Sequence, residues 1–464
     1  MSSGATTSAG SALSPASFSI GEPQWTTVGA TGCGTNGDGE PAIHVSLAND
    51  VFLGSEEGLG NGSDAWRDLG GVGGSGAQAC SLEYRGQPNA LVPGLGLSGG
   101  DIDLAWASAP NAQRTFNLYV ASLNGASVAV AHSSDRGTTF TNVPVQRGLP
   151  LDDREWIAAF GAQTSLLTYH DLRGAIDVLR SDDGGSTYTQ ISQAIPESNY
   201  AAEDNQHGNL VIDRRNTAGT GPGPNAEPGF WAYQSYVAAN SPADQNNTDN
   251  YDTAFVSVSH DGGFTWDARP IPCSFASTPA SPDPTQRGLD HNFPNVSVDP
   301  AGNLWASWSD DRNVFTAVSA DHGSTWACSG PVSTNTAQAI FPWLVATSAG
   351  VDLVYYGSPT APNSSQPQTF SVYFAQNPSA STGGWATPQQ LTAVHKGPVC
   401  ESGVTCTDGR QLLDDFGVDT DQSGWAHIAF TSDADDQFKF SPGGPNSATG
   451  YAVQTGGTPV GAPN

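Results

Sequence analysis

Positively charged residues are scarce in this chain. Lys and Arg number 16 among 464 residues, whereas Asp and Glu number 45, so the formal net charge is −29. This excess of negative charge excludes a nucleic-acid-binding protein and a protein held at membranes by a polybasic patch. Charged residues of both signs make up 13% of the chain, well below the roughly 25% of an average soluble domain.

Long apolar runs and amphipathic helices are also missing. No stretch of about 18 apolar residues occurs, so the sequence predicts no membrane-spanning segment. Residues 1–20 lack the basic start and apolar stretch of a signal peptide. We interpret them as a flexible tail on a secreted, mature chain whose signal has been removed, and we expect a monomer.

Aromatic residues and turn formers, in contrast, are plentiful. The 12 Trp, 12 Tyr and 18 Phe argue against disorder, because disordered chains are poor in aromatics. The 55 Gly and 32 Pro, together with many Ser, Thr, Asn and Asp, separate the aromatic residues at regular intervals. This composition predicts short strands joined by many turns, and therefore an all-β protein.

The cysteines indicate an oxidising compartment. Their even number suits disulfides, and they do not cluster with His at the spacing of a zinc site. Cys400 and Cys406 bracket a short loop, so we expect them to be bonded to each other. Six cysteines allow many connectivities. The other expected pairs are Cys33–Cys80 and Cys273–Cys328.

One phrase, S-x-D-x-G-x-T followed by an aromatic residue, occurs four times. In such a phrase Ser and Asp can bond the backbone of a tight turn, Gly supplies a positive φ, and the aromatic packs beneath. The repeats are therefore expected to be structural turns. The four copies begin at Ser133, Ser181, Ser259 and Ser319.

These four phrases resemble the Asp-box, or BNR, repeats of sialidase-like β-propellers. The resemblance implies a ring of four-stranded antiparallel blades. It also implies that each box joins the third and fourth strands of its blade, on the face away from the active site. The arginine-containing phrase that sialidases carry before their first box is absent here; the corresponding region reads Gly39-Glu40-Pro41-Ala42.

A weaker repeat of paired strands extends the count to seven blades, with six as the alternative. Residues 21–464 are then expected to be one propeller domain. The last blade lacks an obvious fourth strand, and residues 22–29 (EPQWTTVG) are the predicted segment that completes it. Such closure would remove an open sheet edge.

Candidate site residues follow from the positions of these strands. The loop that enters each inner strand and the loop that leaves the second strand should meet near the axis at one end of the propeller. The candidate catalytic residues in such loops are Asp153, Glu155, His170, Asp290, Tyr355 and Tyr356. The candidate substrate-binding residues are Arg154, Arg173, His207, His291, Arg312, Trp343 and Arg410.

The residue types suggest glycan chemistry. Arg binds carboxylates through paired hydrogen bonds, and glycoside hydrolysis needs two carboxyl groups of different roles, or a Tyr nucleophile in sialidases. Structural interpretations compete with these roles. Arg154 and Arg312 could form local ion pairs with neighbouring Asp residues, and only one of the adjacent Tyr355 and Tyr356 can face the axis.

Three functions are therefore compatible with the sequence. The first is a secreted glycoside hydrolase of sialidase-like architecture that acts on a carboxylate-bearing glycan. The second is a polysaccharide lyase that removes a proton from a uronate. The third is a propeller that binds a glycan or a protein without catalysis, because a fold alone does not define a function. No cofactor is required, and calcium is compatible with the acidic composition, although no ligand set can be named.

Overall fold

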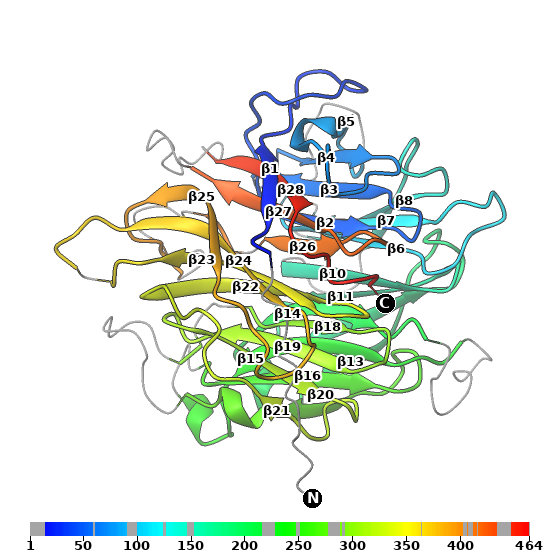
Figure 1. Cartoon of the computed structure of the whole chain (residues 1–464). Helices are drawn as coiled ribbons and strands as arrows, with labels where there is room; N and C mark the ends of the chain where they lie inside the picture. The colour runs from blue at the N-terminus through cyan, green and yellow to red at the C-terminus, as the bar shows by residue number, and fades with distance from the viewer. Residues whose placement is uncertain are drawn as a thin grey trace, which may run out of the picture.

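The chain forms a seven-bladed β-propeller. In the computed structural model, seven separate sheets each contain four antiparallel strands. The innermost strands of successive sheets contact one another, and the last contacts the first, so the ring closes (Figure 1). The larger of the two predicted blade counts is therefore confirmed. The structure describes residues 14–58, 61–90, 100–123, 127–145, 153–215, 228–246, 251–276, 288–289, 293–362, 364–401, 406, 412–414, 416–433 and 447–463.

The blades follow one another along the chain. Blade 1 comprises β2 (Gly39–Val45), β3 (Val51–Glu56), β4 (Ser63–Asp68) and β5 (Glu83–Gly86). Blade 2 comprises β6 (Ile102–Trp106), β7 (Leu118–Leu123), β8 (Val128–Ser133) and β9 (Thr141–Val145). Blade 3 comprises β10 (Asp153–Phe160), β11 (Thr164–His170), β12 (Ile176–Ser181) and β13 (Thr189–Ile195). Blades 4 and 5 comprise β14 (Asn205–Ile212), β15 (Ala232–Ala238), β16 (Thr253–Ser259) and β17 (Asp267–Pro270); and β18 (Asn295–Val298), β19 (Leu304–Ser309), β20 (Val314–Ser319) and β21 (Ala327–Cys328). Blades 6 and 7 comprise β22 (Gln338–Ala346), β23 (Val351–Ser358), β24 (Thr369–Asn377) and β25 (Gln389–Lys396); and β26 (Gly417–Thr420), β27 (Ala426–Ser432), β28 (Ala448–Gly456) and β1 (Ser17–Gly21).

Helices are few and short in the described part of the chain. None of them has the length and apolar character that crossing a bilayer requires. They are the single-turn 3-10 helices η1 (Ala79–Ser81), η2 (Tyr200–Ala202), η3 (Asp244–Asn246) and η4 (Pro272–Ser274).

The hydrophobic core lies between the blades rather than at one centre. Each of the buried apolar clusters joins two neighbouring blades; for example, Phe52 of blade 1 packs with Trp106 of blade 2. Strands buried on both faces explain the continuous burial of segments such as β3 and β16. Every blade shares a cluster with both neighbours, so each contact between neighbouring blades, here called a joint, has its own apolar core.

Blade 7 is closed by β1, which pairs antiparallel with β28 (Figure 1). The predicted closing segment, residues 22–29, is therefore wrong; the strand lies just before it, in part of the predicted tail. Phe18 of β1 packs edge-on against Phe374 of blade 6 at 5.1 Å. Residues 22–29 instead cover the joint between blades 7 and 1, where Trp25 packs against the apolar cluster.

All three predicted disulfides are present. They join Cys33 to Cys80, Cys273 to Cys328, and Cys400 to Cys406. The first links the segment after β1 to η1, and the second links η4 of blade 4 to β21 of blade 5. Two of the bonds therefore hold outer parts of the ring that are distant in sequence.

Each of the four repeated phrases forms the turn between the third and fourth strands of its blade, in blades 2 to 5. In the first, the Ser133 hydroxyl accepts from the Gly137 amide at 2.9 Å, and the Asp135 carboxylate accepts from the Thr139 amide and hydroxyl at 2.8 and 2.7 Å. The other three turns repeat these bonds. Antiparallel order places these turns at one end of the ring, here called the lower end. The inner strands begin at the opposite, upper end.

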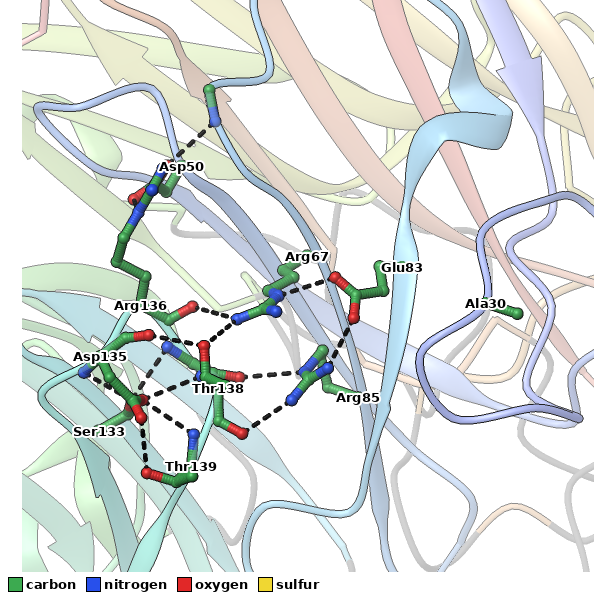
Figure 2. Close-up of polar contacts among 12 residues, drawn as sticks. Ala30, Asp50, Arg67, Glu83, Arg85, Ser133, Asp135, Arg136, Thr138 and Thr139 are labelled. Carbon is green, nitrogen blue, oxygen red and sulfur yellow. Dashed lines mark hydrogen bonds and ion pairs between the residues drawn. The ribbon is translucent and has the colours of Figure 1, made fainter.

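Arginine side chains from blade 1 hold the repeat turn of blade 2 (Figure 2). Arg67 donates to the Arg136 carbonyl at 2.8 Å, and Arg85 donates to the Gly137 and Thr138 carbonyls at 3.0 and 2.8 Å. Glu83 pairs with both arginines at 3.1 and 2.7 Å. The turn is thereby fixed to the neighbouring blade as well as to itself.

The same bond recurs at two further joints. Arg180 of blade 3 donates to the Gly262 carbonyl at 2.8 Å, and Arg269 of blade 4 donates to the His322 carbonyl at 2.6 Å. Arg136, Gly262 and His322 all occupy the fourth position of their repeats, where φ is positive. The left-handed residue thus turns its carbonyl toward an arginine of the preceding blade.

Replacing Arg180 with Ala should lower the free energy of unfolding by about 2–3 kcal/mol, because the side chain is 2% exposed and its loss removes the donor to the Gly262 carbonyl and the ion pair with Asp182. Denaturant unfolding monitored by Trp fluorescence measures this loss. Arg269→Ala is the matched control. It removes the same bond at a 25% exposed position, so its loss should be about 1 kcal/mol. Equal losses in the two variants would contradict the role assigned to burial.

Candidate functional site

The guanidinium of Arg154 lies on the propeller axis at the upper end. Arg154 belongs to blade 3, yet it pairs with Glu40 of blade 1 at 2.5 Å, Asp101 at the start of blade 2 at 3.5 Å and Asp414 before blade 7 at 2.8 Å. It also lies 4.1 Å from the ring centre of Phe293, which precedes blade 5. Only a position on the axis allows contact with so many non-neighbouring blades.

Bulges at the starts of inner strands give these side chains their direction. The pairing register shifts at Glu40 in β2, at Arg154 in β10 and near Phe341 in β22. All three residues have a positive φ, of 55°, 47° and 50°. A bulge redirects a side chain, and strained backbone at non-glycine residues persists where the surrounding structure holds it. The inner strands of blades 1, 3 and 6 thus each begin with a bulge at the upper end of the ring.

Three carboxyl groups gather beside Arg154. Glu40, Glu56 and Asp101 each offer an oxygen within 4.8 Å of those of the other two. Burial raises the pKa of Glu40 well above its usual range, and the carboxylates of Asp414, Asp101 and Glu56 add to this effect, while Arg154 opposes it. The upper end of the axis is therefore an anionic cluster built around one guanidinium.

Two of the predicted site histidines stack beside this cluster. The rings of His170, at the end of β11, and His207, in β14, lie 5.7 Å apart with an interplanar angle of 24°. Burial is the main cause that lowers the pKa of both, and the nearby His170 and Arg154 lower the pKa of His207 further. Both imidazoles are therefore neutral at neutral pH, and each has one nitrogen that can donate a proton and one that can accept a proton.

An aromatic pair lies across the axis below the cluster. The rings of Trp156 in blade 3 and Trp343 in blade 6 are 5.6 Å apart. Blades 3 and 6 are not neighbours, so this contact spans the channel. Trp156 also donates to the His207 carbonyl at 3.3 Å, which ties the aromatic pair to the histidines. Together these residues separate the anionic cluster from the channel below.

Below the tryptophans lies a cavity of about 110 Å³ lined by the middles of the inner strands. His44 faces it between Asp103 at 3.8 Å and Asp419 at 3.3 Å, and Arg214 also lines the cavity. Burial lowers the pKa of His44, but its interactions with the two aspartates outweigh this effect and raise the pKa to about 9. Burial lowers the pKa of Arg214.

His44 should make stability depend on pH. Its pKa is raised from 6.5 to about 9 on folding, so its stabilising contribution is complete below about pH 6.5 and is lost as pH rises through 9. The full contribution is roughly 1–3 kcal/mol, since one pKa unit corresponds to about 1.4 kcal/mol. Urea unfolding of wild type and His44→Asn between pH 6 and 10 measures it. The gap between the two proteins should narrow toward pH 10; a constant gap would contradict the assignment.

Several predicted site residues lie away from the axial cluster. Arg173 is half exposed and pairs with Asp171 at 3.0 Å and Glu197 at 2.6 Å. Arg312 is exposed, and its backbone amide donates to Asp310. Both are positioned as surface residues in loops.

The adjacent tyrosines are both fully buried. Tyr355 stacks on Tyr373 at 5.3 Å, between blades 5 and 6. Tyr356 stacks on Phe416 at 4.0 Å, and its hydroxyl accepts from the Thr431 amide at 2.8 Å. Both aromatic rings therefore contribute to packing between blades.

Four predicted residues cannot be placed as side chains. Asp290, His291 and Arg410 lie outside the described residues, and Asp153 is placed only as the first residue of β10. Of the predicted set, the structure thus brings together Arg154, His170, His207 and Trp343, with Glu155 directly following Arg154 and 2% exposed.

Sequence reasoning missed the acidic partners of Arg154. Glu40, Asp101 and Asp414 are not among the site residues predicted from the sequence. Their signal is positional, because each precedes or begins an inner strand, as Arg154 does. Glu56 carries no such signal, since it ends the second strand of blade 1.

Solved structures that resemble this chain are β-propellers as well. No family model and no curated protein matches the chain. Among solved structures, similar propellers include YCF48 bound to D1 peptide (12% identity, TM-score 0.45, covering 97% of this chain and 100% of that one). Another is the GH74 xyloglucanase from Xanthomonas campestris (14%, 0.48, covering 92% and 55%). A third is a mutant of the Aleuria aurantia lectin in complex with Fucalpha1-6GlcNAc (12%, 0.41, covering 80% and 97%).

The chain spans about half the length of the GH74 enzymes that it matches, at 55% and 52%. At these identities the likeness concerns the fold alone. The structural neighbours thus include glycoside hydrolases and lectins as well as a peptide-binding propeller.

Proposed function

We propose that this protein is a secreted carbohydrate-active enzyme that hydrolyses glycosidic bonds at the upper end of the propeller axis. The observation that supports this most is the convergence of ionisable side chains from blades 1, 2, 3 and 7 on Arg154, above the Trp156–Trp343 pair. Binding sites for small molecules combine aromatic walls with a few placed polar groups. The three disulfides support an oxidising, extracellular location.

The proposed catalytic carboxyl groups are Glu155 and Asp414. They come from blades 3 and 7, and Asp414 is fixed by its 2.8 Å ion pair with Arg154. Hydrolysis of a glycoside needs one carboxyl group as acid and another as base or nucleophile. The neutral His170 and His207, of which His207 lies close to Arg154, would relay protons.

We propose a neutral glycan as substrate, in place of the acidic glycan expected from sequence. The sequence predicts Arg154 as a carboxylate ligand, but this residue contacts three carboxylates of its own chain. A substrate carboxylate brought to this cluster would meet several negative charges in a poorly solvated site, which is unfavourable.

A glycan panel tests this proposal. The intact chain should release reducing ends from a neutral polysaccharide, and Glu155→Gln should cut turnover at least tenfold, about 1.4 kcal/mol of transition-state stabilisation. Glu197→Gln, which removes a half-exposed carboxylate near Arg173, is the control and should keep wild-type turnover.

Three results would overturn the proposal. An unsaturated product absorbing in the ultraviolet would identify a lyase. Glycan binding without release of reducing ends would identify a binding propeller. Release that Glu155→Gln leaves unchanged would place the catalytic centre elsewhere.

A further inference from the structure

Three carboxyl groups form a compact set at the joint between blades 1 and 2. Glu40 lies near the start of β2, Glu56 ends β3, and Asp101 directly precedes β6. Each provides an oxygen within 4.8 Å of the other two. Calcium binds oxygen ligands at about 2.3–2.6 Å, so two ligands on opposite sides of one ion lie about 5 Å apart. The spacing therefore suits a single ion held between the three groups.

Burial makes this set unlike an ordinary acidic patch. Glu40 and Glu56 are 2% and 7% exposed. The Oε2 atom of Glu40 is buried and has no hydrogen-bond partner among the described residues, although Oε1 of the same group pairs with Arg154. Buried polar atoms almost always have a partner, so such an atom indicates a bound water or ion.

A fourth carboxyl group strengthens this point. Asp38 is completely buried, and neither of its oxygens has a hydrogen-bond donor among the described residues. It lies close enough to Glu56 and Glu57 for their charges to interact. Several carboxyl groups thus share one poorly solvated region of blade 1.

Arg154 offers this region a single positive charge. Its guanidinium nitrogens lie 2.5, 3.5 and 2.8 Å from carboxylate oxygens of Glu40, Asp101 and Asp414, so one positive charge faces three carboxyl groups. Burying carboxylates is costly unless they are paired or coordinate a metal. A divalent cation beside Arg154 would balance the remaining charge.

We propose that Glu40, Glu56 and Asp101 bind a calcium ion that joins blade 1 to blade 2. A set of carboxylates without His or Cys selects a hard cation rather than zinc or copper. Magnesium demands a near-ideal octahedron and gives up water reluctantly, so the buried carboxylates suit calcium better. Asp101 is the most exposed of the three, with 16% of its side chain accessible, and marks the side from which the ion enters. The site does not depend on the proposed hydrolysis.

Calcium titration of the intact chain tests the site. Protein stripped with EDTA and desalted into 150 mM NaCl should bind one Ca²⁺ per chain in isothermal titration calorimetry. Its Tm should rise by about 2–5 °C in 1 mM CaCl₂, because a ligand that binds only the folded state stabilises it. Magnesium at the same concentration should raise the Tm by less than half as much.

Matched variants separate this site from general attraction of calcium to a chain of charge −29. Glu56→Gln and Asp101→Asn should each abolish the stoichiometric binding and the Tm rise, with wild-type far-UV circular dichroism. Glu197→Gln removes one charge from a half-exposed side chain and should bind calcium as wild type does. No binding at 1 mM Ca²⁺, or wild-type binding by both site variants, would overturn the proposal. Calcium binding with no glycan hydrolysis would leave this inference standing and reject the proposed function alone.

Discussion

Replacing Arg154 with methionine should lower the free energy of unfolding by about 3–5 kcal/mol, the cost of removing one partner from a buried ion pair. The side chain is 7% exposed, and methionine keeps much of its apolar stem while removing the charge. The variant leaves Glu40 and Asp414 without the ion pairs that they make at 2.5 and 2.8 Å. Guanidinium or urea unfolding at pH 7 measures the loss.

The pH dependence of the same variant identifies the cause. The freed carboxyl groups take up protons as pH falls, Glu40 first because burial already raises its pKa, so the difference between wild type and variant should shrink as pH falls from 9 to 4. Arg173→Met is the control, because that side chain is half exposed and solvent screens its ion pairs, so its loss should change stability little. A loss at Arg154 no larger than that at Arg173 would mean that the axial cluster does not stabilise the ring.

Removing the Cys33–Cys80 disulfide should cost about 4 kcal/mol, because the bond closes a segment with a sequence separation of 47. The Cys400–Cys406 bond, with a separation of 6, should contribute only about 2 kcal/mol by the same loop-entropy relation. Paired Cys→Ala variants of each bond, compared by denaturant unfolding, test the order. A larger loss from the shorter loop would show that native-state contacts, and not loop closure, determine the contribution. Mass spectrometry of the native protein should find all six cysteines oxidised.

The use of arginine illustrates what sequence reasoning could and could not find. With few basic residues in the chain, arginines in predicted upper loops stand out as candidate substrate ligands. The structure gives four other arginines, Arg67, Arg85, Arg180 and Arg269, a role that was not predicted, at the joints between blades at the lower end. Arg180 and the Gly262 carbonyl that it binds are separated by 82 positions in sequence. No local pattern reports such a contact, because it exists only once two blades have packed.

The residues of the candidate site were also only partly predictable from the sequence. Arg154, Glu155, His170 and His207 could be selected because they flank predicted strands at equivalent ends. Tyr355 and Tyr356 were selected for the same reason, but the rings of both pack between blades. Period-two alternation predicts which face of a strand a residue occupies. In a propeller both faces are buried, so alternation cannot separate core from axis.

The sequence by itself determined the repeating unit of this protein. The four Ser/Asp/Gly/Thr turns are stabilised by bonds within a few residues, and the strand pairs form locally, so both can be recognised from the order of residues alone. The tertiary structure decided how the ring closes and which side chains meet on its axis. The contacts of Arg154 with Glu40, Asp101 and Asp414 cross blades 1, 2, 3 and 7. The contact with Asp414 requires the first and last blades to lie side by side, as they do in the ring that the pairing of β1 with β28 completes.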